Sequence, residues 1–181
     1  SGTLLEQEPR QMWLRVAKAF GATDEERRLF QGILWNFKFV PGGRVLSAAG
    51  SAGTFYNCYG IGFDPTDSRK GVDSKHAIMN AISLMVNLTS LGGGVGLNWS
   101  ALRPEGAYIK GVHGRSSGPI SWMHGADGMA NAIRQGGSRT AALMFLLEVW
   151  HPDILKLRDQ RFHRANYSVA LTKEFIQAVK G

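Results

Sequence analysis

Several features that would fix the class of this protein at once are missing. The 181 residues include a single cysteine, so no disulfide can close within the chain and no cysteine pair can hold a metal. No apolar run approaches the roughly 18 residues of a membrane-spanning helix. The first residues lack the basic and then apolar stretch of a secretory signal. We therefore expect a cytoplasmic protein in a reducing compartment, without a membrane partner.

A concentrated run of basic residues is also missing. Lys and Arg number 21 against 14 Asp and Glu, which gives a net charge of +7, but no run of five or six basic residues occurs. The charge favours an anionic partner, which can be a nucleotide, a nucleic acid or an acidic protein surface. The dispersion does not indicate a nucleic-acid-binding stripe. The five histidines lack metal-binding spacing such as His-Glu-x-x-His, so we assign no metal and expect His151 to cap or pack.

Glycine, in contrast, is abundant and is clustered. Residues 91–98 read LGGGVGLN, residues 110–119 read KGVHGRSSGP and residues 134–139 read RQGGSR. Glycines let a backbone approach a ligand closely. Successive exposed N–H groups can cradle a phosphate, and arginines can grip it with two hydrogen bonds. The pattern favours a nucleotide site made of several loops.

Residues 1–40 are predicted to be a helical segment. A first helix over residues 8–20 has Pro9 in its first turn and apolar residues at helical spacing. A second helix begins at Thr23, where Thr23 and Glu26 have the spacing of a capping box. Its apolar residues, which we expect in the core, are Leu29, Phe30, Ile33, Leu34 and Phe37. Pro41 and the two glycines after it then end the helix.

Residues 41–181 alternate between strand and helix patterns. Strands are expected at 54–61, 95–99, 141–149 and 166–171, with helices at 72–90 and 120–133, after Trp150, and from Thr172 to residue 180. The apolar run at 141–149 predicts a strand buried on both faces. Four such units imply an α/β fold with parallel strands and right-handed crossovers, as an open sheet or as part of a barrel. Because an open last strand would leave an apolar edge, we expect this chain to be part of something larger.

Eight segments of the chain resemble the catalytic subunit of ribonucleotide reductase. In order they are 40–44 (VPGGR), 57–59 (NCY), 92–98 (GGGVGLN), 102–106 (LRPEG), 114–121 (GRSSGPIS), 135–139 (QGGSR), 150–154 (WHPDI) and 166–170 (NYSVA). One of them alone would be weak, but the collinear series covers nearly the whole chain. The segment 118–123 (GPISWM) favours the adenosylcobalamin-dependent class, class II, over the iron-dependent class.

The resemblance implies a ten-stranded α/β barrel made of two half-barrels. Residues 1–40 would be a helical lead and residues 41–181 most of the first half-barrel. The partner would then be the complementary remainder of the reductase, which would hold most of the adenosylcobalamin site. A naturally split gene product, an extein piece and a truncated piece of the subunit all fit. We expect no N-terminal ATP-binding regulatory domain.

The resemblance also assigns catalytic and substrate-binding residues. Cys58 would be one of two cysteines that reduce the ribose and become a disulfide, which a thioredoxin-like reductant restores. The partner cysteine, the radical cysteine and a nearby glutamate are not in this chain, so we expect it to be inactive alone. Asn57, on the same strand as Cys58, would bind the ribonucleotide together with Gly42, Gly93 and Gly94. Without the resemblance, Cys58 would be a small buried hydrophobe and the glycines a tight strand entry.

The family also binds a deoxynucleoside triphosphate effector. An acidic–serine pair after the cysteine would be Asp67 and Ser68, with Asp64 as the alternative. The remaining effector residues would be Arg103, Ile109 and Lys110 in a first loop and Gln135 and Arg139 in a second. The second loop has one basic residue where the family commonly has two. For Arg103 and Lys110, a solvated surface position is the alternative.

The sequence also bears on the oligomeric state and leaves two other functions open. In dimeric relatives the helix after the first loop lies at a subunit interface, and here it would offer Trp122, Met123, Met129 and Ile133, so a homodimer is expected. The second functional reading is a non-catalytic nucleotide-sensing or partner-binding module of the same fold. Retention of Cys58 favours the reductase, because sensing does not need a thiol. A nucleic-acid-binding domain is the third reading, and it predicts a steep salt dependence of binding.

Overall fold

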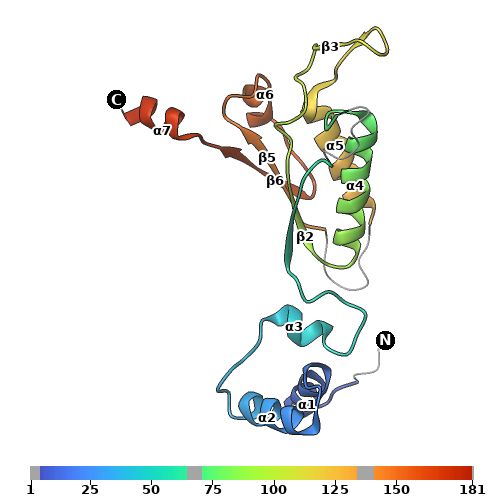
Figure 1. Ribbon diagram of the computed structural model, residues 1–181, viewed down its shortest axis with the longest axis vertical. Helices are drawn as coiled ribbons and strands as arrows, with labels where there is room; N and C mark the ends of the chain where they lie inside the picture. Colours follow the sequence, from blue (N-terminus) through green and yellow to red (C-terminus); the bar gives the residue numbers. More distant parts are fainter. Residues whose placement is uncertain (1–4, 65–70, 134–140, 181) are drawn as a thin grey trace. The chain divides into compact units, whose positions relative to one another are not determined.

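The computed structural model describes residues 5–64, 71–133 and 141–180, and the chain divides into two compact units. The first unit runs up to Asn57 and the second starts at Cys58. Each unit has a hydrophobic core of its own. Figure 1 shows helices in the first unit and helices with strands in the second.

The first unit is built from α1 (Pro9–Phe20), α2 (Asp24–Trp35) and the short α3 (Gly43–Ala48). Its core residues are Trp13, Val16, Ala17, Leu34 and Ala49. The predicted capping box is confirmed, because the Thr23 hydroxyl accepts the Glu26 N–H and the Glu26 carboxylate accepts the Thr23 N–H. Four orphan N–H groups begin every helix, and this box satisfies two of them.

Helix α2 ends earlier than predicted, and part of its expected core face is in solvent. Asn36 caps it by donating from its side chain to Gly32 O, and Phe37 has a positive φ of 51°. Phe37 is 69% exposed and Leu29 is 59% exposed, so neither belongs to the core. The reason is that α2 buries one stripe, centred on Leu34, against α1. Helix α3 lies in a segment where no helix was predicted.

The second unit confirms the predicted parallel sheet. Its strands are β1 (Cys58–Ile61), β2 (Gly94–Asn98), β5 (Leu143–Glu148) and β6 (Ala165–Ala170), in the order β1-β2-β5-β6. All three strand pairs are parallel. Strand β1 is shorter than predicted and starts at Cys58, so Asn57 precedes the strand and is not part of it.

A small antiparallel hairpin was missed. Strands β3 (Tyr108–Ile109) and β4 (Gly114–Arg115) pair between β2 and the next helix, so β2 is not followed directly by a helix. Two hydrogen bonds close the base of the hairpin, from Gly106 N to Ser116 O and from Ser116 N to Ala107 O, both 2.8 Å. Strands of two residues are too short to show a periodic pattern in a sequence.

The helices of the second unit are α4 (Lys75–Ser90), α5 (Gly118–Ala132), α6 (Ile154–Arg158) and α7 (Lys173–Lys180). Helix α4 begins after Ser74, whose hydroxyl accepts the Ala77 N–H, and so starts later than predicted. Thr172 accepts the Phe175 N–H, which confirms the predicted cap of the last helix. Within the described ranges, no helix has both the length and the apolar character needed to cross a bilayer.

The sheet has one covered and one open face. Helices α4 and α5 lie side by side along one side of the sheet (Figure 1). Against them, the strands bury Val95, Leu97, Leu143, Phe145 and Leu147. The prediction that residues 141–149 are buried on both faces is wrong, because exposure alternates along β5 and Met144 is 38% exposed. Side chains of a strand point to opposite faces in turn, and both crossover helices pack on the same one.

Helix α5 is tied to the start of β6 by a buried carboxylate. Asp127 accepts the backbone N–H groups of His163, Arg164 and Ala165 at 2.7, 2.7 and 2.9 Å. Met123, which we predicted to be available for a subunit interface, is fully buried in the core instead. Met129, six residues further along α5, is 46% exposed.

Candidate functional site

The thiol of Cys58 stands on the open face of the sheet, at the first residue of β1. Cys58 is exposed, so its alternative reading as a small buried hydrophobe is wrong. Its register partner on β2 is Gly94, and the next pair on this face is Gly60 with Gly96. Apart from the thiol, these four positions therefore present only backbone to the open side. A ligand can lie closely against such a floor.

Larger side chains border the glycine floor on the neighbouring strands. In register, Gly96 is followed across the sheet by Met144 of β5 and Asn166 of β6. The Ser168 hydroxyl lies 3.4 Å from the Met144 sulfur, so the two side chains are in contact. The open face thus combines a thiol, bare backbone, a thioether and two small polar groups.

The structure separates two glycines that the sequence treats alike. Gly93 is buried, and a Cβ there would lie 2.5 Å from Cε2 of Tyr59 and 3.2 Å from Leu88 O. Glycine at this position is what lets the Tyr59 ring pack beside the thiol-bearing residue. Gly94 is half-buried and adjoins Cys58 on the open face. Gly94 therefore faces the open side of the sheet, and Gly93 allows the Tyr59 ring to pack beside it.

The other predicted substrate residues lie outside this floor. Asn57 directly precedes Cys58 and is exposed. Gly42 belongs to the first unit, where it occupies the N-cap of α3, and a Cβ on it would meet nothing within 4 Å. The structure thus brings Cys58, Gly93 and Gly94 together, with Asn57 next to them in the chain.

A second polar region begins after β2, where two buried residues hold the loop that carries Arg103. His151 donates from Nε2 to Leu102 O at 2.9 Å and accepts the Asp153 N–H on Nδ1 at 3.1 Å. The Asp153 carboxylate accepts the Glu105 N–H at 2.8 Å. His151 and Asp153 are 2% and 3% exposed. The packing and capping role expected for His151 is confirmed, and the loop backbone is fixed on both sides of Arg103.

Arg103 contacts Asp73, which belongs to an acidic–serine pair that was not predicted from the sequence. Its Nε donates to the carboxylate of Asp73, and its Nη1 donates to Tyr108 O at 3.5 Å. Asp73 is followed by Ser74, the N-cap of α4. Arg103 is therefore ion-paired, and its side chain remains partly exposed. The signal available in the sequence was a second Asp–Ser dipeptide, placed directly before a helical pattern.

The hairpin carries the next two predicted effector residues. Ile109 is the second residue of β3, and the exposed Lys110 follows it in the turn. Within the hairpin, the Tyr108 hydroxyl and His113 Nδ1 are 2.9 Å apart. Arg103 is linked to this hairpin through Tyr108 O. The remaining predicted effector residues, Asp67, Ser68, Gln135 and Arg139, lie outside the described residues.

A small charge network lies where the Arg103 loop meets α6. Lys156 forms ion pairs with Glu105 at 2.6 Å and with Asp153 at 3.3 Å. The hydrogen bond that Lys156 donates to Glu105, with a smaller effect of the one to Asp153, raises the pKa of Lys156 against the opposing effect of desolvation. Across residues 5–64, 71–133 and 141–180, no three His, Cys, Asp or Glu side chains are grouped to hold a metal ion.

The second unit is thus an α/β protein whose parallel sheet has helices on one side and a thiol on the other. Residues 66–181 match the family described as ribonucleotide reductase, barrel domain, and the chain belongs to this family.

Individual relatives agree with the family match. The chain is 31% identical over 174 residues to the ribonucleoside-diphosphate reductase subunit alpha of Chlamydia trachomatis, which covers 90% of this chain and 16% of the relative. It is 30% identical over 158 residues to the vitamin B12-dependent ribonucleoside-diphosphate reductase of Mycobacterium tuberculosis, and this match covers 83% of this chain and 22% of the relative. It is 29% identical over 153 residues to the vitamin B12-dependent ribonucleoside-diphosphate reductase of Thermoplasma acidophilum, and this match covers 81% of this chain and 19% of the relative. The chain therefore spans about a fifth of these relatives.

Proposed function

We propose that this chain is part of the catalytic subunit of a ribonucleotide reductase and carries its first redox cysteine. The observation that carries the proposal is the exposed thiol of Cys58 on a glycine floor, in a chain of the reductase barrel family. Because Gly60, Gly94 and Gly96 have no side chains, a ribose can lie directly against the backbone of this floor. The names of the relatives favour a ribonucleoside diphosphate as the substrate.

In the proposed reaction, Cys58 acts with a second cysteine thiol. The C2′–OH bond of the ribose breaks and a C2′–H bond forms. The two thiols lose two electrons and two protons and become a disulfide, and the hydroxyl leaves as water. A dithiol reductant of the thioredoxin kind then returns the disulfide to two thiols.

The second cysteine must come from outside these 181 residues, because Cys58 is the only one in the sequence. We propose that the four parallel strands belong to the first half of a ten-stranded barrel. The remainder of the reductase would then supply the second thiol, the radical cysteine and the other half-barrel. On this account the chain alone binds nucleotides but does not reduce them.

We further propose that the region around Arg103 binds a deoxynucleoside triphosphate effector. Arginine can hold phosphate with two parallel hydrogen bonds, and Lys110 and Ile109 lie on the hairpin linked to it. The contact with Arg103 favours Asp73 and Ser74 as the acidic–serine pair in place of Asp67 and Ser68. Gln135 and Arg139 remain the predicted second loop.

Adenosylcobalamin is proposed as the radical source, because relatives that need vitamin B12 match this chain. When bound, it supplies the radical that starts the reaction. We assign no cobalamin ligand to the described residues and derive no step through the cofactor.

The test is reconstitution with the complementary part of the reductase. The two parts would be combined, and formation of deoxyribonucleotide would be measured with and without adenosylcobalamin. The comparison is between the unchanged chain, Cys58→Ser and Ser83→Ala, which removes an exposed hydroxyl on α4. We expect cobalamin-dependent product that Cys58→Ser abolishes and Ser83→Ala preserves.

Two other outcomes would count against the proposal. Product formation by Cys58→Ser would remove the redox role of Cys58. A folded complex that binds nucleotides without forming product would favour the nucleotide-sensing module. Circular dichroism of each variant shows whether the complex is folded.

A further inference from the structure

The first unit has a basic surface that the proposed reductase chemistry does not use. Helices α1 and α2 border two neighbouring hollows, with volumes of about 280 and 490 Å³, which share Leu14 and Gln31 as lining residues. We call this surface the α1–α2 groove. It lies outside residues 66–181, which match the barrel family. Arginine and lysine side chains line it, and no acidic side chain is among its described lining residues.

Some of these cations are already paired and others are not. Arg15 is held by Glu6 at 2.6 Å, and Arg27 is held by Asp24 at 2.9 Å. In contrast, Lys18 of α1 and Arg28 of α2 have no ion-pair partner among the described residues. Among the described residues, the groove therefore keeps at least one positive charge without an ion-pair partner on each of its two helices.

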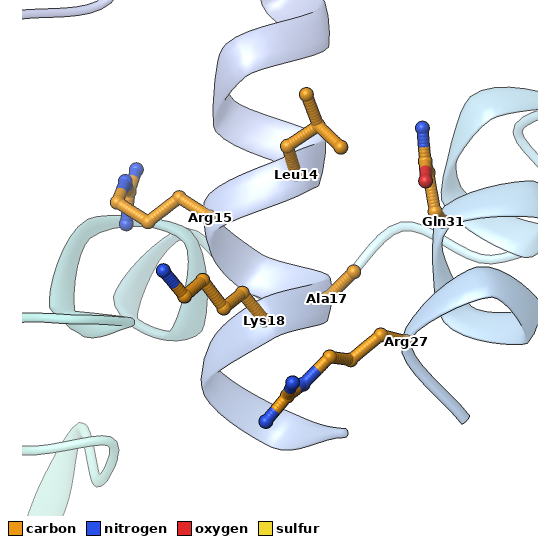
Figure 2. A pocket seen from close by; sticks show the side chains of 6 residues that line it. All are labelled: Leu14, Arg15, Ala17, Lys18, Arg27 and Gln31. Atoms are coloured by element: carbon orange, nitrogen blue, oxygen red, sulfur yellow. The ribbon is translucent and has the colours of Figure 1, made fainter. Parts of the chain in front are cut away.

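The floor of the groove is apolar. Leu14 is 48% exposed although it lies next to the buried Ala17. Figure 2 shows these two residues with Arg15 and Lys18 on one side and Gln31 on the other. An apolar strip with cations at its borders is complementary to a segment that has an apolar stripe and carboxylates beside it.

Two features disfavour phosphate-bearing ligands. The guanidinium of Arg10 lies 3.9 Å from the centre of the Trp35 ring, so the face of the indole that it covers cannot stack on a base. Arg10 and Lys18 are eight residues apart on one helix, or about 12 Å along its axis. Cations spread along an apolar strip do not converge on one phosphate group as a phosphate site requires.

We propose that the α1–α2 groove docks an acidic amphipathic segment of a partner protein. An apolar side chain of the segment packs on Leu14, and its carboxylates pair with Lys18 and Arg28. This interaction surface is independent of the reductase chemistry. It would also explain part of the net charge of +7, because Lys18 and Arg28 would face the carboxylates of an acidic protein partner.

The experiment uses the full chain and a fluorescein-labelled helical peptide of about 15 residues. The peptide contains leucines three and four residues apart and glutamates elsewhere. A scrambled peptide of the same composition and an oligo-dT strand are the comparison probes. Dissociation constants would be measured by fluorescence anisotropy at two salt concentrations.

The decisive variants remove two charges each. In the double variant Lys18→Gln with Arg28→Gln, the fold is kept because both positions are exposed and glutamine favours helices. The matched control is Lys38→Gln with Arg161→Gln, which makes the same change at exposed positions outside the groove. We expect the groove variant to weaken binding of the patterned peptide about tenfold and the control less than about twofold.

Each other result overturns the proposal. Equal binding of the scrambled peptide would mean that charge alone attracts the probe. Binding of oligo-dT that depends on Lys18 and Arg28 would assign the groove to a nucleic acid. If no probe binds, or if the control variant weakens binding as much as the groove variant, the groove is a solvated surface. Circular dichroism excludes an unfolded variant as the cause.

Discussion

The two faces of the parallel sheet are made by the same four strands but carry opposite kinds of residue. The face towards α4 and α5 carries Val95, Leu97 and Phe145, all at most 2% exposed. The other face carries Cys58 and glycines, with Met144 beside them. The comparison shows that this sheet draws its stability from one face and leaves the other free to be shaped for a ligand.

The open face has a stability cost that the covered face offsets. Glycine inside a strand costs roughly 0.5–1 kcal/mol relative to alanine, because more backbone entropy is lost and no side chain packs. Burial of one large apolar side chain contributes about 1.5–3 kcal/mol. The buried side chains of β2 and β5 can therefore offset the glycines at positions 60, 94 and 96.

The largest expected effect compares adjacent residues of β5. Phe145→Ala should destabilise the second unit by about 3–5 kcal/mol, because it leaves a cavity in the core between the sheet and its helices. Met144→Ala, on the open face, should cost roughly 1 kcal/mol or less. Urea denaturation followed by circular dichroism measures both. Equal costs would show that the open face is packed and would remove the contrast between the two faces.

The next effect concerns Gly93, which directly precedes β2, and Gly60, which lies within β1. Gly93→Ala should cost about 1–3 kcal/mol, because its Cβ would lie 2.5 Å from the Tyr59 ring. A Cβ at Gly60 would meet nothing within 4 Å, so Gly60→Ala should stabilise the sheet by roughly 0.5–1 kcal/mol, because less backbone entropy is lost on folding. The midpoints of urea unfolding give the comparison. If Gly60→Ala were the more destabilising change, the glycine floor would have a structural role.

A smaller effect compares a helix that covers the sheet with one that does not. Ser74→Ala removes the N-cap of α4 and should cost about 1 kcal/mol. Thr172→Ala removes the corresponding cap of α7, which buries no residue, so global unfolding should not change. Thermal unfolding measures the first, and NMR chemical shifts of residues 173–180 measure local fraying in the second. A lower melting temperature for Thr172→Ala would show that α7 is packed.

The smallest effect is a pH dependence limited to α7. Hydrogen bonds from its own backbone N–H and from Thr172 lower the pKa of Glu174 below 4.5 in the folded helix. Because the folded pKa is the lower one, the stabilisation is present above pH 4.5 and is lost as the pH falls through the folded value. NMR shifts of α7 should therefore move towards coil values on acidification. The melting temperature of the sheet should not depend on the protonation of Glu174. In Glu174→Gln, this local transition should be absent.

Features that depend on a few consecutive residues could be predicted from the sequence. The capping box of Thr23 and Glu26 and the cap at Thr172 are such cases, since each partner lies three residues away. The positions of β2, β5 and β6 and their parallel pairing were also predictable, because the alternation of strand and helix patterns has one common solution.

Features that depend on distant neighbours could not be predicted. The first five residues of β5, LMFLL, are all apolar, and only Glu148 at the end of the strand marks the open side, so the positions of α4 and α5 decide which of the apolar residues are buried. The pair Asp73–Ser74 was hidden because the predicted helix over 72–90 placed both residues inside it. Once α4 is seen to begin at Lys75, Ser74 is its cap and Asp73 is free to meet Arg103.

The position of the Cys58 thiol on the open face depends on the register between β1 and β2, in which Cys58 pairs with Gly94. Strand side chains alternate with a period of two, so a shift of one residue in β1 would turn the thiol towards the helices and Tyr59 towards the ligand side. A substitution in β1 or β2 changes one side chain. The loss or gain of one residue moves each following side chain of the strand to the opposite face of the sheet. The loss or gain of one residue in β1 or β2 is therefore a larger change to this face than a substitution at any single position of either strand.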